Sequence, residues 1–308
     1  MARLYTYLIV AFLTGGAAVQ AQQLQQFSQF RFAGQSFNPA FAGSDAYFNA
    51  LAVHRTQWAG INDAPRTYLM GLHAPSADGK MGFGGTLYTD AVGPTRRTGV
   101  QGNYAYHLQV TDNSKLALGL AFGFTQFSID GSQITLREQG DLAAINGMQA
   151  ELKPDAAFGA LWYSDKWFVG LSANQILNNR LDFFPGDNEG RMAVHYFLTG
   201  GYRFDLNEDF AAEPAVLVKY VSPLPPQADL TLRLIYKGNL WLGGSYRTGD
   251  AASVYAGYNV MDYLTLGYAY DITTSSIRQY AEGTHEVFLA LRFARNTPSP
   301  EPAEQTMK

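Results

Sequence analysis

The side chains most able to carry catalysis or to hold a metal ion are scattered in this sequence. Its five histidines fall one to a segment, without the spacing of a zinc motif: His54, His73, His107, His195 and His285. The chain has no cysteine, which excludes a disulfide framework, a thiolate metal site and a cysteine nucleophile. It also lacks a glycine-rich phosphate loop and a G-x-S-x-G turn. We therefore expect no catalytic residue, no cofactor and no metal site.

The composition favours strands and argues against nucleic acid as a partner. Of the 308 residues, 47% are hydrophobic and only 16% are charged, and the chain contains 31 Gly, 20 Phe and 19 Tyr. About a quarter of an ordinary soluble domain is charged, so this chain is unusual for a cytoplasmic protein. Aromatic residues are enriched in strands. The formal charge of −4 supplies no basic surface for DNA or RNA.

The first 21 residues have the pattern of a secretory signal peptide. Arg3 supplies the positive end, residues 4–13 form an apolar run, and Val19-Gln20-Ala21 offers small residues for cleavage. The run is shorter than the roughly 20 residues that a membrane-spanning helix needs. No second long apolar run follows. We expect the mature chain either to be soluble outside the inner membrane or to cross an outer membrane as a β-barrel.

Alternation of polar and apolar residues favours the barrel. It is clearest in residues 97–110, 116–124, 229–236 and 264–270. About fourteen such segments occur, each near the roughly 9 to 11 residues that a tilted strand needs to cross a bilayer. Short turns alternate with generally longer connections, such as residues 130–153 and 177–191, and in outer-membrane barrels the short turns face the periplasm.

The expected fold class is therefore all-β, a transmembrane antiparallel β-barrel of about 14 strands. The sequence divides into a signal peptide at 1–21, a periplasmic N-terminal segment at 22–46, the barrel at 47–294 and a disordered periplasmic tail at 295–308. An even number of strands places both termini in the periplasm. A soluble β-sandwich or propeller would also alternate, but its solvent face should carry many Lys and Glu, which are sparse here.

Two sets of residues have expected places in such a barrel. Inward polar residues would give a lumen of mixed charge, either open as a channel or plugged: Arg97, Gln101, Asn103, Asp229, Arg233, Glu286 and Arg292. Aromatic residues at segment ends would suit a girdle at the membrane interface: Trp58, Tyr104, Trp162, Trp167, Trp241 and Tyr246.

An ordered series of short runs resembles the PorP/SprF family of type IX secretion system outer-membrane proteins. The runs include QFSQF at 26–30, NPAFAGS at 38–44, RTQWAG at 55–60, APRT at 64–67, DAVGPT at 90–95, GYRF at 201–204, GGSYR at 243–247, GYAYD at 267–271 and GTHEV at 283–287. They cover essentially the whole mature barrel in order. Phe41, His107 and Thr284 depart mildly from the family pattern, and the branch of the family is left open.

The resemblance implies a fourteen-stranded barrel in the outer membrane of Bacteroidetes-type bacteria that is an accessory of the type IX machine. Some members of that family contact periplasmic components of the machine, and others accompany one secreted surface protein, including gliding adhesins. The expected partners are therefore periplasmic and outer-membrane components of type IX secretion, a secreted surface client protein and outer-membrane lipid.

Residues of the family motifs are candidates for contact with a partner or for architecture: Asn38, Pro39, Gly43, Arg55, Gln57, Trp58 and Pro65. Asn38-Pro39 and Gly43 would form a turn that leads into the first strand. Arg55 and Gln57 would hydrogen-bond inside the lumen.

The function expected is that of a non-enzymatic accessory barrel that supports export or surface attachment of a client through protein contacts. The N-terminal segment and the short turns would meet the secretion machinery, and the connections 130–153 and 177–191 would meet the client. Two alternatives stay open at this point. One is a passive outer-membrane porin for small solutes, and the other is a lipid-modifying barrel enzyme that uses His195 or His285.

Overall fold

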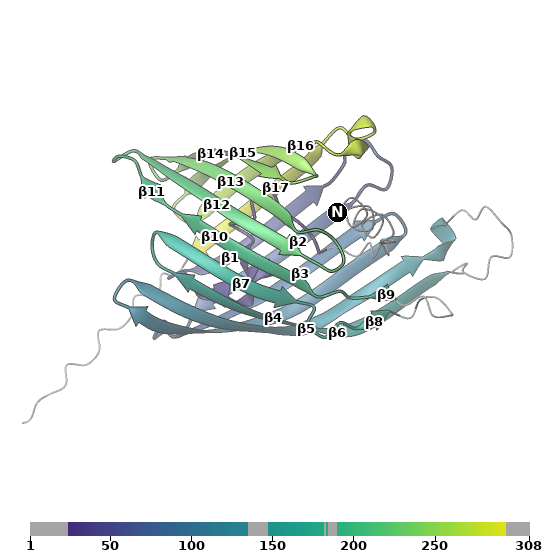
Figure 1. The fold of residues 1–308 in the computed structure, drawn as a ribbon, viewed down its shortest axis with the longest axis horizontal. Coiled ribbons are helices and arrows are strands. Elements are labelled where there is room, and N and C mark those ends of the chain that lie inside the picture. Colours follow the sequence, from purple (N-terminus) through teal and green to yellow (C-terminus); the bar gives the residue numbers. More distant parts are fainter. Residues whose placement is uncertain (1–23, 135–146, 182, 184–189, 294–308) are drawn as a thin grey trace, which may run out of the picture.

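The structure is a closed β-barrel. The computed structural model of the chain describes residues 24–134, 147–181, 183 and 190–293. The expected signal peptide at 1–21 and tail at 295–308 lie outside these residues. Each wall strand is antiparallel to its neighbours, and the first strand pairs with the last to close the wall (Figure 1).

The expected architecture is confirmed, since the described residues contain fourteen wall strands. They are β1 (Phe48–Thr56), β2 (Arg66–Pro75), β3 (Met81–Val92), β4 (Thr95–Thr111), β5 (Ser114–Asp130), β6 (Met148–Tyr163), β7 (Trp167–Asn174), β10 (His195–Tyr202), β12 (Phe210–Tyr220), β13 (Gln227–Tyr236), β14 (Leu240–Arg247), β15 (Ala251–Met261), β16 (Leu264–Thr273) and β17 (Thr284–Phe293).

The remaining elements are short. The two-residue strand β11 (Phe204–Asp205) follows β10 and pairs with β12, and β8 (Arg180–Leu181) pairs with β9 (Gly190–Arg191). The helical turns are α2 (Gly34–Phe37), η1 (Pro39–Phe41), η2 (Gly131–Gln133) and η3 (Ser276–Gln279). Among the described residues, no helix combines the length and the apolar character needed to cross a membrane.

The two faces of the wall differ as the alternation predicts. On β5, Leu120 and Phe122 point outward and are each 58% exposed, whereas Ala117 and Ala121 point inward and are buried. Outward residues meet across strands, as Leu120 does with Tyr104 on one side and Phe158 on the other. An apolar outer face of this kind is stable against lipid hydrocarbon rather than water.

The two ends of the barrel carry different connections. We call one the short-turn end, which includes residues 112–113, 164–166 and 237–239. The other, the long-loop end, includes residues 57–65, 131–147, 175–194 and 274–283, although residues 93–94 and 248–250 make tight connections there as well. Strands β4 to β6 reach furthest at the long-loop end (Figure 1).

One expected boundary was wrong. Residues 148–153 were expected in a loop, but they belong to β6, where they continue the ladder with residues 125–130 of β5. The sequence MQAELK alternates apolar and polar residues, as a strand does. Part of each expected client loop, at 135–146 and at 182 and 184–189, lies outside the described residues.

Candidate functional site

The segment before β1 lies inside the barrel, not in the periplasm as expected. We call residues 24–46 the lumen segment. Its side chains and backbone bond to inward residues on opposite parts of the wall: Gln35 Nε2 donates to Gly85 O of β3 (2.8 Å), Ser172 Oγ of β7 donates to Phe37 O (2.7 Å), and Ser28 Oγ donates to Asp271 Oδ1 of β16 (2.5 Å). A segment can touch strands on all sides only from within the lumen.

The lumen segment runs from one end of the barrel to the other. Its first described residue, Leu24, donates its backbone N–H to Nε2 of His195, the first residue of β10, at the long-loop end (3.3 Å). Its last turn lies at the short-turn end, where Gly43 N donates to His73 Nδ1 near the end of β2 (3.3 Å). The chain then enters β1 at Phe48.

A buried charged cluster fixes the first part of this segment. Arg55 of β1 donates to Asp271 Oδ2 of β16 (2.7 Å) and to Glu286 Oε2 of β17 (3.0 Å), and all three residues are at most 2% exposed. Glu286 also accepts the backbone N–H groups of Ser28 (2.8 Å) and Gln29 (3.1 Å). Ser28 Oγ accepts from Arg55 Nη1 (2.8 Å). The carboxylate of Glu286 therefore joins the first strand, the last strand and the lumen segment.

A second ion pair lies beside this cluster. Arg247 of β14 donates to Asp229 Oδ1 of β13 (2.8 Å) and to Asp250 Oδ2 (3.1 Å), and both Arg247 and Asp229 are buried. Arg247 Nη2 also donates to Phe27 O of the lumen segment (3.5 Å). Buried charges are retained at low cost only when they are paired and hydrogen-bonded. The wall thus meets the backbone of the lumen segment with charge-assisted hydrogen bonds.

Asn38 organises the second part of the lumen segment. Its Oδ1 accepts from Ala40 N (2.9 Å) and so caps the turn η1, in which Pro39 occupies the first position. Its Nδ2 donates to Ala160 O of β6 (3.0 Å) and to Leu171 O of β7 (3.2 Å). Asn38 is 1% exposed and Pro39 is also buried. Neither is available to a partner in this structure.

The NPAFAG run lies directly against the backbone of the wall. A Cβ added to Gly119 of β5 would overlap the backbone of Ala40, and one added to Gly159 of β6 would overlap Asn38 Oδ1. Gly43 has a φ of +69°, and a Cβ there would lie 2.5 Å from Gly82 Cα of β3. His107 Nε2 of β4 bonds to Ala42 O (2.9 Å). At Gly119 and Gly159 the wall has no side chain, which leaves room for this turn.

Replacing Asn38 by alanine is expected to lower the free energy of unfolding by about 2 kcal/mol, because the variant loses a cap and two hydrogen bonds to wall carbonyls. The measurement is the unfolding midpoint of the purified barrel in detergent, followed by its heat-modifiable mobility on a gel. Asn62, exposed in the connection between β1 and β2, is the matched control, and Asn62→Ala should change stability by no more than about 0.5 kcal/mol. Equal midpoints for the two variants would contradict the assigned role of Asn38.

The inward polar residues named from the sequence take part in separate contacts. Arg97 donates to Tyr88 Oη (3.2 Å) and lies over the Tyr88 ring, and Gln101 donates to Asp155 Oδ2 (3.0 Å). Asn103 is buried beside them on β4. Asp229 and Glu286 belong to the two ion clusters above.

The last two inward residues lie nearer the short-turn end. Arg233 pairs with Glu213 of β12, and Arg292 of β17 lies over the Tyr47 ring. The structure brings Arg233 together with Arg31 of the lumen segment, since both reach Glu213.

Gln57, Trp58 and Pro65 lie at the long-loop end, away from the NPAFAG run. Gln57 N donates to Pro65 O (2.9 Å), which extends the β1–β2 ladder by one bond. Trp58 has a φ of +54°, and its N–H donates to Thr284 Oγ1 (3.1 Å). All three are partly exposed. The motif residues therefore fall into a buried group in the lumen and a group at the mouth of the barrel.

The lumen also contains an apolar core, which corrects the expectation for Trp241. That residue was expected in an interfacial girdle, but it points inward, is 4% exposed, and packs on Phe32 (ring centroids 5.5 Å apart). Phe27, Phe30 and Phe37 of the lumen segment are buried in the same cluster. Trp162 does point outward, at the short-turn end, where its ring meets Trp167 edge to face. Aromatic residues thus pack in the lumen as well as on the lipid face.

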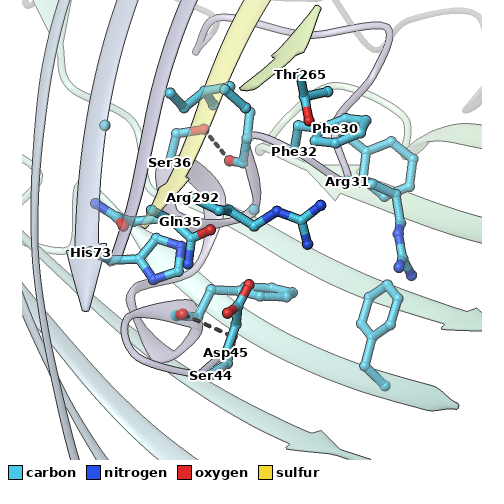
Figure 2. Close-up of a pocket in the computed structure, with 18 of the residues that line it drawn as sticks. Phe30, Arg31, Phe32, Gln35, Ser36, Ser44, Asp45, His73, Thr265 and Arg292 are labelled. Atoms are coloured by element: carbon cyan, nitrogen blue, oxygen red, sulfur yellow. Dashed lines mark hydrogen bonds between the residues drawn. The ribbon is translucent and has the colours of Figure 1, made fainter. Parts of the chain in front are cut away.

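A cavity of about 530 Å³ lies between the lumen segment and the short-turn end. Ser164 and Gly238, which line it, belong to two of the short turns. Figure 2 shows Arg31 and Arg292 directed into this space, with Phe30 and Phe32 beside them. Both charged and aromatic side chains line this cavity, which we call the recess.

Fourteen antiparallel strands with an apolar outer face and a polar, occupied lumen define an outer-membrane β-barrel protein whose own N-terminal segment lies inside the barrel. The profile of the family described as type IX secretion system membrane protein PorP/SprF matches residues 19–291. The chain belongs to this family, which confirms the resemblance noted in the sequence. It is an outer-membrane barrel associated with type IX secretion.

Solved structures with the same architecture come from transport proteins. The toluene transporter TbuX of Ralstonia pickettii superposes with a TM-score of 0.54 at 10% identity, over 85% of this chain and 94% of that one. The monoaromatic hydrocarbon channel CymD gives a TM-score of 0.51 at 11% identity, over 86% of this chain and 93% of that one. At such low identity these likenesses concern the fold alone. A search of curated protein sequences finds no significant match.

Proposed function

We propose that this protein is a non-enzymatic accessory of the type IX secretion system that supports export or surface attachment of a client protein, such as a gliding adhesin. Its family membership over residues 19–291 carries the proposal. The occupied lumen supports it, because a barrel filled by its own chain is better suited to protein contact than to diffusion of solutes.

The two ends of the barrel suggest a division of contacts. The short-turn end would face the periplasm, where components of the secretion machinery would bind. This end includes the recess that Arg31 and Arg292 line. The long-loop end, with its extended β4, β5 and β6, is offered to the outside, where the client would be met. We assign no partner to the lumen segment, since most of it is buried inside the barrel.

Deletion of the gene is expected to abolish surface delivery of one client while leaving other type IX substrates in place. Surface proteins would be released from intact cells with protease and quantified by mass spectrometry. The same strain carrying the wild-type gene on a plasmid is the control. Delivery of every client at normal levels would refute the accessory role.

An affinity pull-down from detergent-solubilised outer membranes tests for the contacts directly. We expect recovery of periplasmic type IX components or of one large surface protein with the tagged barrel. An unrelated tagged barrel from the same membranes is the control for adhesion to hydrophobic surfaces. Recovery of the folded barrel alone would favour the porin alternative.

A further inference from the structure

We infer that the lumen segment begins, at Leu24, in the mouth of the barrel that opens onto the outer surface of the cell. This inference goes beyond the proposed function and rests only on the course of the chain and on the orientation of outer-membrane barrels. It replaces the expectation of a periplasmic N-terminus.

The contacts of the first described residues place them at the long-loop mouth. Leu24 N bonds to His195, the first residue of β10, and Gln26 Nε2 donates to Oε1 of Gln227, the first residue of β13 (2.5 Å). Phe27 O accepts from Arg247, the last residue of β14. Each of these three wall residues is the terminal residue of its strand at the long-loop end. Leu24 and Gln26 therefore lie level with that rim of the barrel.

The lumen segment runs in one direction, from the long-loop end toward the short-turn end. From Leu24 the chain descends through the Arg55–Glu286 cluster to Gly43, which contacts Gly82 and His73 near the short-turn end. The lumen along this path contains the aromatic core of Phe27, Phe30 and Phe37. The packed core leaves the open recess on the short-turn side of the segment, away from Leu24.

The length of chain before Leu24 supports the same conclusion. Cleavage after Ala21 would leave two residues, which span at most about 7 Å. Strand β7 has 8 residues, and a strand of that length rises roughly 20 Å along the barrel axis at a tilt of about 40°. Two residues starting at the long-loop rim cannot reach the periplasm through the lumen.

The orientation of the whole barrel then decides which compartment this is. Outer-membrane barrels have short turns in the periplasm and longer loops outside. The end at which Leu24 lies carries the connections 57–65, 131–147, 175–194 and 274–283. The start of the lumen segment, at Leu24, thereby faces the medium at the same end as the loops proposed to meet the client.

Single-cysteine labelling tests this directly, because the chain has no native cysteine. Intact cells that express Gln23→Cys would be treated with a membrane-impermeant maleimide and compared with two matched variants. The first, Asn62→Cys, replaces a residue exposed at the long-loop end. The second, Asp112→Cys, replaces a residue exposed in the β4–β5 turn at the short-turn end. We expect Gln23→Cys to be labelled like Asn62→Cys, and Asp112→Cys to be labelled only after the outer membrane is permeabilised.

Three results would overturn the inference. These are labelling of Gln23→Cys only after permeabilisation, its labelling only after denaturation, and labelling of Asp112→Cys but not Asn62→Cys in intact cells. The experiment does not depend on export of a client. Its failure is therefore distinct from a failure of the proposed accessory function, which the deletion strain measures.

Discussion

Replacing Glu286 by alanine is expected to lower the free energy of unfolding by about 3 to 5 kcal/mol, the largest stability loss that we predict for a single residue. Among the described residues, the substitution leaves Asp271 as the remaining carboxylate partner of the buried Arg55 guanidinium. It also removes the acceptor for the Ser28 and Gln29 backbone N–H groups. The measurement is the denaturant midpoint of the purified barrel in detergent.

Two further variants separate the charge from the shape of Glu286. Glu286→Gln keeps the size and one strong acceptor, so it should lose less stability than Glu286→Ala. Glu208→Ala, in an exposed short turn, should change stability by no more than about 0.5 kcal/mol. A Glu286→Ala barrel as stable as the Glu208→Ala barrel would show that the cluster contributes nothing.

Removal of residues 25–37 is expected to convert a barrel without steady current into one that conducts ions continuously in a planar bilayer. These residues supply Phe27, Phe30 and Phe37 to the apolar core of the lumen. The inward residues left behind include the charged Arg55, Asp229 and Glu286, which would be hydrated. Steady conduction by the intact chain would instead favour the passive porin.

Because the deletion itself can prevent folding, a point substitution provides a second test. Gly119→Val places a side chain where the backbone of Ala40 lies, and this backbone cannot move aside as a flexible side chain can. We expect it to displace the NPAFAG run and to raise conductance. Gly71→Val is the matched control, since a Cβ at Gly71 meets no atom within 4 Å. Equal, low conductance of both variants would contradict the packing described here.

The wall of the barrel could be predicted from local sequence because each strand carries its own pattern. The alternation of Leu118, Leu120 and Phe122 with Ala117 and Ala121 separates a lipid face from a lumen face without knowledge of any neighbour. The same holds for Arg97 and Asn103 on β4, which turn inward opposite Val100 and Tyr104. Element type and strand number follow from such patterns.

The lumen segment could not be placed in this way. Residues 24–46 contain no sustained alternation, and their position depends on contacts with strands far along the chain, such as Asn38 with Ala160 and Ser28 with Glu286. One signal was available: the inward positions of β5 and β6 include Gly119 and Gly159, which leave room for another backbone. Trp241 was misassigned for the same reason, because its partner Phe32 belongs to the lumen segment.

The position of Arg55 and Glu286 has a consequence for the order of assembly. They are paired residues in the ladder between β1 and β17, the first and last strands of the wall, so they meet only when these two strands are joined. The same two side chains hold Ser28. Closure of the seam therefore also completes the site that holds Ser28, and a barrel with an open seam lacks this contact. The contact of Arg55, Glu286 and Ser28 therefore distinguishes a closed barrel from one whose seam is still open.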